Sequence, residues 1–133
     1  MTIQVPDSFK DLLLDETRAF AHLATTMADG SPQVTTVWFD TDDGVIRITT
    51  AEGRTKWRNM MQRPQVAMVI ARPDDPYRYL QIRGVVTGWT KDGARQHMDR
   101  LAKKYRGWET YPVPAGQQRV TFTIRPESIS IEV

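Results

Sequence analysis

The sequence predicts a mainly β protein in which an antiparallel sheet closes into a barrel and a few helices pack around it. Three observations carry this prediction. Short segments rich in β-branched and aromatic residues recur along the chain. Short turns join most of these segments, and the one long helical pattern follows most of the strands rather than alternating with them. A closed sheet is also favoured because it leaves no long edge unpaired.

Three helices are predicted from apolar residues that repeat at i, i+3 and i+4. The first begins at residues 7–8, whose polar side chains can cap it. The second begins at residues 55–56 and ends before Pro64, because the residue before a proline avoids the helical conformation. The third covers residues 91–105, and we expect Asp92 to cap it.

About seven strands are predicted where β-branched and aromatic residues alternate or run together. They cover residues 18–27, 33–40, 45–50, 65–72, 79–87, 119–125 and 128–133. Turns rich in glycine, aspartate or proline separate them, including one at residues 74–76. The strands at 33–40 and 65–72 have apolar residues on both faces, so neither is expected to face open solvent. Pro126 is expected to divide the last two strands.

Length and composition predict a single globular domain over residues 1–133. Hydrophobic residues make up 40% of the chain and charged residues 26%, and the net charge of +2 is too small to favour nucleic acid or membrane binding. No segment approaches the roughly 20 apolar residues of a membrane span, and the N-terminus lacks the apolar core of a signal peptide. We therefore expect a cytoplasmic protein whose ligand is a small molecule.

The side chains that most often carry catalysis are scarce. Because there is no cysteine, disulfides, thiolate chemistry and cysteine-based zinc sites are excluded. His22 and His97 lie far apart and form no HExxH-like spacing, so we interpret both as structural residues and expect no metal site. No GxSxG, P-loop or GxGxxG motif is present. An enzyme with this set of residues would depend on a cofactor for its reactivity.

The turn between the strand at 45–50 and the following helix is the best candidate for a binding site. It holds Gly53, Arg54 and Lys56, and two cations beside the free N–H groups of a helix start suit a phosphate. Residues 53–72 contain five basic residues and no acidic one, which produces a local positive field. Spacing alone leaves open the alternative that Arg54 and Lys56 are simply solvated.

Four pieces of the sequence together resemble one family. The first is GRTKWRNM at residues 53–60, with the Arg-Pro dipeptide and the strand that follow it. The others are residues 29–39, 79–84 and 117–129. In order and spacing they resemble the flavin/deazaflavin split-barrel family, the pyridoxamine-phosphate-oxidase-like superfamily, with its R-x-K-x-R-N-(L/M)…P signature. The chain is most similar to the short members that use the deazaflavin coenzyme F420.

The resemblance implies a split β-barrel of about six to seven antiparallel strands with three helices. It also implies a homodimer with the cofactor sites at the interface. Arg54 and Lys56 would hold the cofactor's phosphate, and Arg58 is expected to meet a second negative group. The later strand would supply side chains to the partner subunit's site. The implied cofactor-binding residues are Gln33, Val34, Thr35, Thr36, Val37, Thr49, Thr50, Arg54, Lys56, Arg58, Tyr77, Tyr79 and Gln81.

The function that the resemblance implies is a reductase that uses reduced F420 to transfer a hydride to an unsaturated or quinone-like small molecule. The F420 tail carries a phosphodiester and glutamate carboxylates, which suits the acid-free stretch that also includes Arg63 and Arg72. Two alternatives stay open, an FMN-dependent oxidoreductase of the same fold and a non-catalytic protein that binds or carries the cofactor. The identity of the substrate cannot be read from the sequence. Tyr79 and His22 are the candidates for a proton donor.

Two further features are expected to serve the site. Residues 107–118 have no periodicity and form a long loop, which is typical of functional loops. Its Trp108 and Tyr111 are candidates for stacking on a ring. The apolar strands carry more surface than one barrel interior needs, so side chains such as Trp38, Phe39 and Met68 are expected to meet a second copy.

Overall fold

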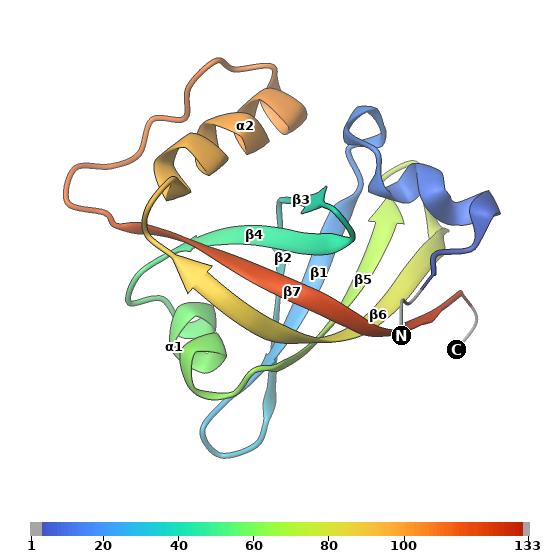
Figure 1. The fold of residues 1–133 in the computed structure, drawn as a ribbon, viewed down its shortest axis with the longest axis horizontal. Helices are drawn as coiled ribbons and strands as arrows, with labels where there is room; N and C mark the ends of the chain where they lie inside the picture. The colour runs from blue at the N-terminus through green and yellow to red at the C-terminus, as the bar shows by residue number, and fades with distance from the viewer. Residues whose placement is uncertain (1–3, 132–133) are drawn as a thin grey trace.

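The computed structural model describes residues 4–131, and seven strands in this part of the chain form one curled sheet (Figure 1). Their order across the sheet is β2-β1-β5-β6-β7-β4-β3, and every neighbouring pair is antiparallel. The prediction of a mainly β, barrel-like antiparallel fold is confirmed. The strands are β1 (Phe20–Thr26), β2 (Pro32–Val37), β3 (Phe39–Asp42), β4 (Val45–Ala51), β5 (Gln65–Arg72), β6 (Asp75–Thr90) and β7 (Arg119–Ser130).

Two α-helices pack against the sheet, α1 (Thr55–Gln62) against β1 and β4 and α2 (Ala94–Arg106) against β7 and β4. The predicted first helix is instead 3₁₀-helical, in two pieces, η1 (Asp7–Leu13) and η2 (Asp15–Thr17), and no side chain caps it. Apolar residues at i and i+3 suit three residues per turn as well as the α-helix, so the pattern did not separate the two. The prediction that Asp92 caps α2 is wrong, because Gly93 precedes the helix in a left-handed conformation with φ of 76°.

Three predicted boundaries of strands and turns are wrong. The predicted strand 33–40 divides at Trp38, where the chain leaves its pairing with β1 and joins β4. The two predicted C-terminal strands are one, β7, because Pro126 lies opposite Gly84 at a register shift. A proline is tolerated there since a bulge interrupts the ladder of hydrogen bonds. β6 already begins at Asp75 and the turn occupies residues 73–74, so the predicted turn at 74–76 begins one residue late and ends two residues late. Residues 132–133 of the predicted last strand lie outside the described residues.

The core fills the concave side of the curled sheet with the apolar side chains that alternate along the strands. Phe39 and Met68 belong to this core and are buried, so the prediction that they face a second copy is wrong. Val34 on β2, in contrast, points outward and is 64% exposed. Among residues 4–131 no helix is long and apolar enough to cross a membrane.

The sheet closes through a single residue. β2 and β3 are the two edge strands, yet only Trp38 separates them in the chain, so the chain crosses from one edge to the other at this point. β3 pairs with β4 only as far as Ile48. The remainder of β4, Thr49 to Ala51, therefore faces β2 across an opening in the barrel. The candidate site lies in this opening.

Candidate functional site

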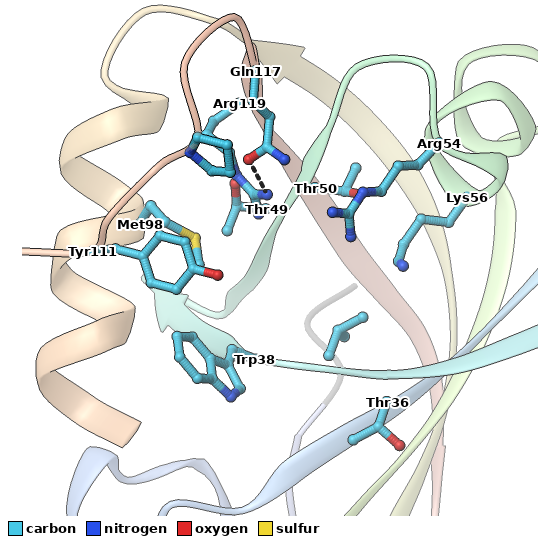
Figure 2. A pocket seen from close by; sticks show the side chains of 12 residues that line it. Thr36, Trp38, Thr49, Thr50, Arg54, Lys56, Met98, Tyr111, Gln117 and Arg119 are labelled. Atoms are coloured by element: carbon cyan, nitrogen blue, oxygen red, sulfur yellow. Dashed lines mark hydrogen bonds between the residues drawn. The ribbon is translucent and has the colours of Figure 1, made fainter. Parts of the chain in front are cut away.

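A cavity of about 260 Å³ occupies the opening between β2 and β4. The loop that follows α2 covers it on one side, and the turn that leads into α1 borders it on the other (Figure 2). We call it the main cavity. The residues that line it are Thr36, Val37, Trp38, Thr49, Thr50, Arg54, Lys56, Met98, Tyr111, Pro114, Gln117 and Arg119.

The turn between β4 and α1 places the two predicted phosphate-binding cations at the main cavity. Gly53 takes a positive φ of 95°, which glycine adopts without strain, and this reverses the chain after β4. Arg54 then stands in extended conformation directly before the helix, and Lys56 lies in its first turn. The predicted start of the helix at Thr55 is confirmed. In Figure 2 both side chains point into the opening between the strands.

Arg54 and Lys56 also line a second hollow of about 350 Å³, so they stand between two spaces. The second hollow extends from the main cavity along the start of α1 and the inner side of β2. Its other lining residues are Gln33, Thr35, Gly53, Thr55 and Arg58. Arg58 donates a hydrogen bond to the carbonyl of Gly53, which holds its side chain beside the turn.

The main cavity carries uncompensated positive charge. Its lining includes Arg54, Lys56 and Arg119 but no acidic residue, and within residues 4–131 none of these three cations forms an ion pair. Burial lowers the pKa of Lys56 below its ordinary value, and the charges of Arg54 and Arg119 lower it further. Burial and the charge of Arg54 likewise lower the pKa of Arg119. An anion in this cavity would relieve the repulsion.

The same region holds buried polar atoms without partners. Four buried side-chain atoms in the described part of the chain lack a hydrogen bond: Oγ1 of Thr35, Thr49 and Thr50, and Nε of Arg119. Each of these residues lines the main cavity or the second hollow. Because native proteins leave few buried polar groups unpaired, their concentration here indicates a place where a ligand supplies the missing partners.

One wall of the main cavity is apolar and aromatic. Trp38 stacks on Tyr105 with ring centroids 5.1 Å apart, and Tyr111 meets the Trp38 ring edge-on at 6.0 Å. Met98 completes this wall from α2. The backbone N–H of Tyr111 donates to Oδ1 of Asp99 at 2.8 Å, which ties the 107–118 loop to the helix. Such a wall suits contact with a planar ring.

A buried ion network fixes α2 over the barrel. Nε2 of His97 lies 2.9 Å from Oδ1 of Asp40, and its Nδ1 lies 3.0 Å from Oγ1 of Thr121. Asp40 also accepts hydrogen bonds from Arg47 and Arg100. Burial alone would raise the pKa of Asp40, but the hydrogen bonds from His97 and Arg47 outweigh it and hold the pKa far below its usual value. This geometry agrees with the structural interpretation of His97.

The structure brings together nine of the thirteen residues predicted to bind the cofactor. Thr36, Val37, Thr49, Thr50, Arg54 and Lys56 line the main cavity, and Gln33, Thr35 and Arg58 line the second hollow. The other four lie elsewhere in this chain. Val34 points away from the barrel, and Tyr77 is 90% exposed at the start of β6. Tyr79 and Gln81, further along β6, are half-buried and line neither space.

Four other residues considered for this region lie outside the main cavity. Arg63 donates to the carbonyl of Thr26 and to Asn59, so it serves the fold. Arg72 pairs with Asp74 and Asp11 beside η1. The positive field at the site therefore covers a smaller area than we expected from the run of basic residues. Neither proposed proton donor, His22 or Tyr79, lines the main cavity, and His22 is exposed on the outer face of β1.

Sequence reasoning missed Arg119 and Gln117, which close the main cavity opposite the turn. Nη1 of Arg119 lies 3.1 Å from Oε1 of Gln117, the contact drawn in Figure 2. One signal was present in the sequence: a charged residue opens a strand of alternating apolar residues and threonines, although nothing local indicated what the charge faced. Tyr111, considered as a ring-stacking residue, does line the cavity, whereas Trp108 does not.

Comparisons with known proteins agree on one family. The family model described as pyridoxamine 5'-phosphate oxidase matches residues 6–131. Among solved structures, one described as an F420 reductase is 38% identical, with a TM-score of 0.85, over 96% of this chain and 100% of that chain. A comparison with curated proteins found no match.

More distant structures share the fold alone. The heme storage protein HutZ from Vibrio cholerae is 16% identical, with a TM-score of 0.67, over 97% of this chain and 95% of that chain. General Stress Protein 26 from Bacillus anthracis is 18% identical, with a TM-score of 0.63, over 90% of each chain. Proteins of this fold therefore differ in what they bind, and the choice of ligand has to be argued from the site.

Proposed function

The chain belongs to the pyridoxamine 5'-phosphate oxidase family, and on that premise we propose that it is a reductase that uses the reduced deazaflavin coenzyme F420. The acceptor of the hydride is an unsaturated or quinone-like small molecule. The observation that carries this proposal is a cavity with an aromatic wall whose cations have no ion-pair partners, and whose buried hydroxyls have no hydrogen-bond partners, among the described residues. The 38% identity to a structure described as an F420 reductase supports the choice of cofactor.

The residues present fit a phosphorylated, ring-bearing cofactor. Arg54 offers a planar fork of donors and Lys56 a point charge, beside free N–H groups at the start of α1. The unpartnered hydroxyls of Thr49 and Thr50 suit a hydroxylated chain. The wall that contains Trp38 suits a planar ring. When bound, the deazaflavin supplies the hydride, and the protein supplies binding and orientation.

The second hollow favours the deazaflavin over FMN. FMN ends at its phosphate, whereas F420 continues through a phosphodiester to an anionic tail. Arg54 and Lys56 line both spaces, so a phosphate held by them leaves room on either side. Arg58 lies in the second hollow and offers a further cation on the side away from the aromatic wall. A ligand that extends past its phosphate uses this space, and one that ends there does not.

Titration of the purified protein with each cofactor tests the proposal. We expect F420 to quench tryptophan fluorescence at lower concentration than FMN, and to bind more weakly as salt rises, because exposed charges are screened within about 10 Å at 0.1 M salt. If FMN binds more tightly at every salt concentration, the protein is an FMN-dependent oxidoreductase. If F420 binds but its reduced form is not oxidised by any of a panel of quinones and enones, the protein is a carrier of the cofactor.

A further inference from the structure

Arg119 is a buried cation without an ion pair in the described part of the chain. It opens β7 and is 8% exposed. Its side chain makes one hydrogen bond in the described part of the chain, from Nη1 to Gln117, and its Nε has no partner. A buried charge without a counter-ion costs free energy. A bound anion at Arg119 would therefore be stabilised by both its charge and its free donors.

Arg119 lies across the main cavity from the phosphate-binding turn, near enough for its charge to lower the pKa of Lys56. Arg54 and Lys56 border both spaces, but Arg119 lines only the main cavity, on the side of Tyr111 and Gln117. Figure 2 shows the hydroxyl of Tyr111 pointing into the same space. An anionic group at Arg119 would thus lie beside the aromatic wall, where a ring and an acceptor meet. It would lie away from the second hollow, where a tail extends.

The free donors of Arg119 match a carboxylate. Because Gln117 occupies Nη1, the N–H groups of Nε and Nη2 are left, and these two lie on one edge of the guanidinium plane. That edge binds the two oxygens of a carboxylate in parallel, a geometry that a lysine does not reproduce. The hydroxyl of Tyr111 can donate to the same group.

We propose that Arg119, together with Gln117 and Tyr111, forms a carboxylate-binding subsite for the acceptor, so that the protein acts on unsaturated or quinone-like acids. This inference rests on the proposed function for the role of the ligand, but the subsite is defined by this chain's own residues. Gln117 orients the guanidinium, and the loop that carries Gln117 and Tyr111 sets the distance between the carboxylate and the aromatic wall.

The first experiment needs no cofactor. A naphthoquinone that carries a carboxylate side chain and the methyl ester of the same compound are titrated against the protein, with quenching of tryptophan fluorescence as the signal, since Trp38 lines the cavity. We expect the acid to bind about 10- to 100-fold more tightly than the ester, the range for a hydrogen bond to a charged group. Equal binding of acid and ester to the unmodified protein would overturn the proposal.

Substitutions of Arg119 test whether this residue produces the preference for the acid over the ester. Arg119→Gln should reduce the ratio of acid to ester affinity to near one, and Arg119→Lys should leave an intermediate ratio because it keeps the charge but not the fork. Arg95→Gln removes the same charge from an exposed position on α2 and should retain the full ratio. If Arg119→Gln does not fold, the Arg119→Lys ratio decides. A full preference in Arg119→Lys would refute the bidentate subsite.

Titration with F420 shows whether the carboxylate at Arg119 belongs to the acceptor or to the anionic tail of the cofactor. If the acceptor supplies it, Lys56→Ala weakens F420 binding about 10-fold or more, and Arg119→Gln weakens it far less. Equal losses in the two variants would assign Arg119 to the anionic tail of the cofactor and overturn the acceptor subsite. If neither F420 nor FMN binds, the proposed function fails, and the ratio of acid to ester affinity still decides whether Arg119 binds carboxylates.

Discussion

At the scale of single residues, the buried polar side chains fall into two groups with different partners. Asp40 is 1% exposed, yet each of its oxygens accepts hydrogen bonds from cations or His97. Thr49, Thr50 and Arg119 are also buried, yet each has a polar atom without a partner in residues 4–131. A satisfied network stabilises one arrangement of the fold, whereas unsatisfied groups around a cavity are available to a ligand. We therefore expect the first group to stabilise the fold and the second group to bind a ligand.

Replacing either phosphate-site cation should weaken cofactor binding without unfolding the protein. We expect Arg54→Ala and Lys56→Ala each to cost about 1.5–3 kcal/mol of binding free energy, the range for hydrogen bonds to charged groups. The fold should be retained because neither side chain forms an ion pair within residues 4–131. Calorimetric titration with the cofactor measures the loss, and Arg95→Ala is the control. Unchanged affinity in both variants would place the phosphate elsewhere.

Phosphate binding should also depend on the titration of Lys56. Its pKa in the folded protein is lowered from 10.5 by burial and by the two neighbouring arginines, and a bound anion would raise it again. Affinity should therefore fall as pH rises toward 10.5, and binding in that range should take up protons. Calorimetry in buffers of different ionisation enthalpy measures the uptake. Lys56→Arg should abolish it, since arginine stays charged; an unchanged uptake would exclude Lys56 as its source.

Asp40 should be a main source of stability. Removing one partner of a buried ion pair costs about 3–5 kcal/mol, and we expect a loss of this size for Asp40→Asn in urea unfolding at pH 7. Because the folded-state pKa of Asp40 lies below its usual 3.8, its contribution is present above that pH and is lost as pH falls below it. The difference between the two proteins should narrow in acid. Asp42→Asn, exposed on the same strand, is the control and should change little.

At the scale of elements, two glycines of β6 face β7 and differ in their surroundings. A Cβ at Gly84 would lie 2.7 Å from the carbonyl oxygen of Arg125, at the register shift opposite Pro126. A Cβ at Gly88 would meet only Oγ1 of Thr123, at 3.4 Å. Neither glycine has a positive φ, so the difference between them is one of space alone.

This pair gives a matched test of the bulge. Gly84→Ala forces two backbones apart and should destabilise the protein by about 1–3 kcal/mol, as overpacking does. Gly88→Ala should be close to neutral because its contact is an ordinary one. Urea unfolding of both variants measures the difference. Equal effects would mean that the chain relaxes at Gly84, and that the bulge does not require a glycine.

At the scale of the whole molecule, the outer face of β2, β1, β5 and β6 lacks a covering layer in the described chain. Cross-strand register places Val34, Ala24 and Ala67 in one row of this face, and Thr36, His22, Val69 and Gln81 in the next. Tyr79 lies on the same face of β6 as Gln81. Val34, Tyr79 and Gln81 were predicted to bind the cofactor but do not line this chain's own site, and all three lie on this one face.

We propose that two copies meet through this face, as an isologous contact would bury it in both. Sedimentation velocity should then show a dimer at micromolar concentration, and a dominant species near 15.3 kDa would contradict it. Val34→Lys, which puts a charge in the middle of the face, should shift the protein to monomer. If Tyr79 completes the partner's site, mixing Lys56→Ala with Tyr79→Ala chains should restore part of the cofactor binding. No recovery despite subunit exchange would show that each chain builds its own site.

The sequence by itself determined what depends on neighbours a few residues away. Alternation of apolar residues placed the buried strands, and Gly53 with the two following cations marked the turn before α1, because hydrogen bonding and steric preference in a turn act locally. Tertiary structure decided which distant groups meet. Trp38 ends a strand because the chain changes partner there, although its neighbours are all strand formers. Arg63 and Arg72 bind acceptors elsewhere in the fold, whereas Arg119 lies close enough to Lys56 to lower its pKa. Which charges are paired and which stay free depends on the surfaces that the folded sheet brings together.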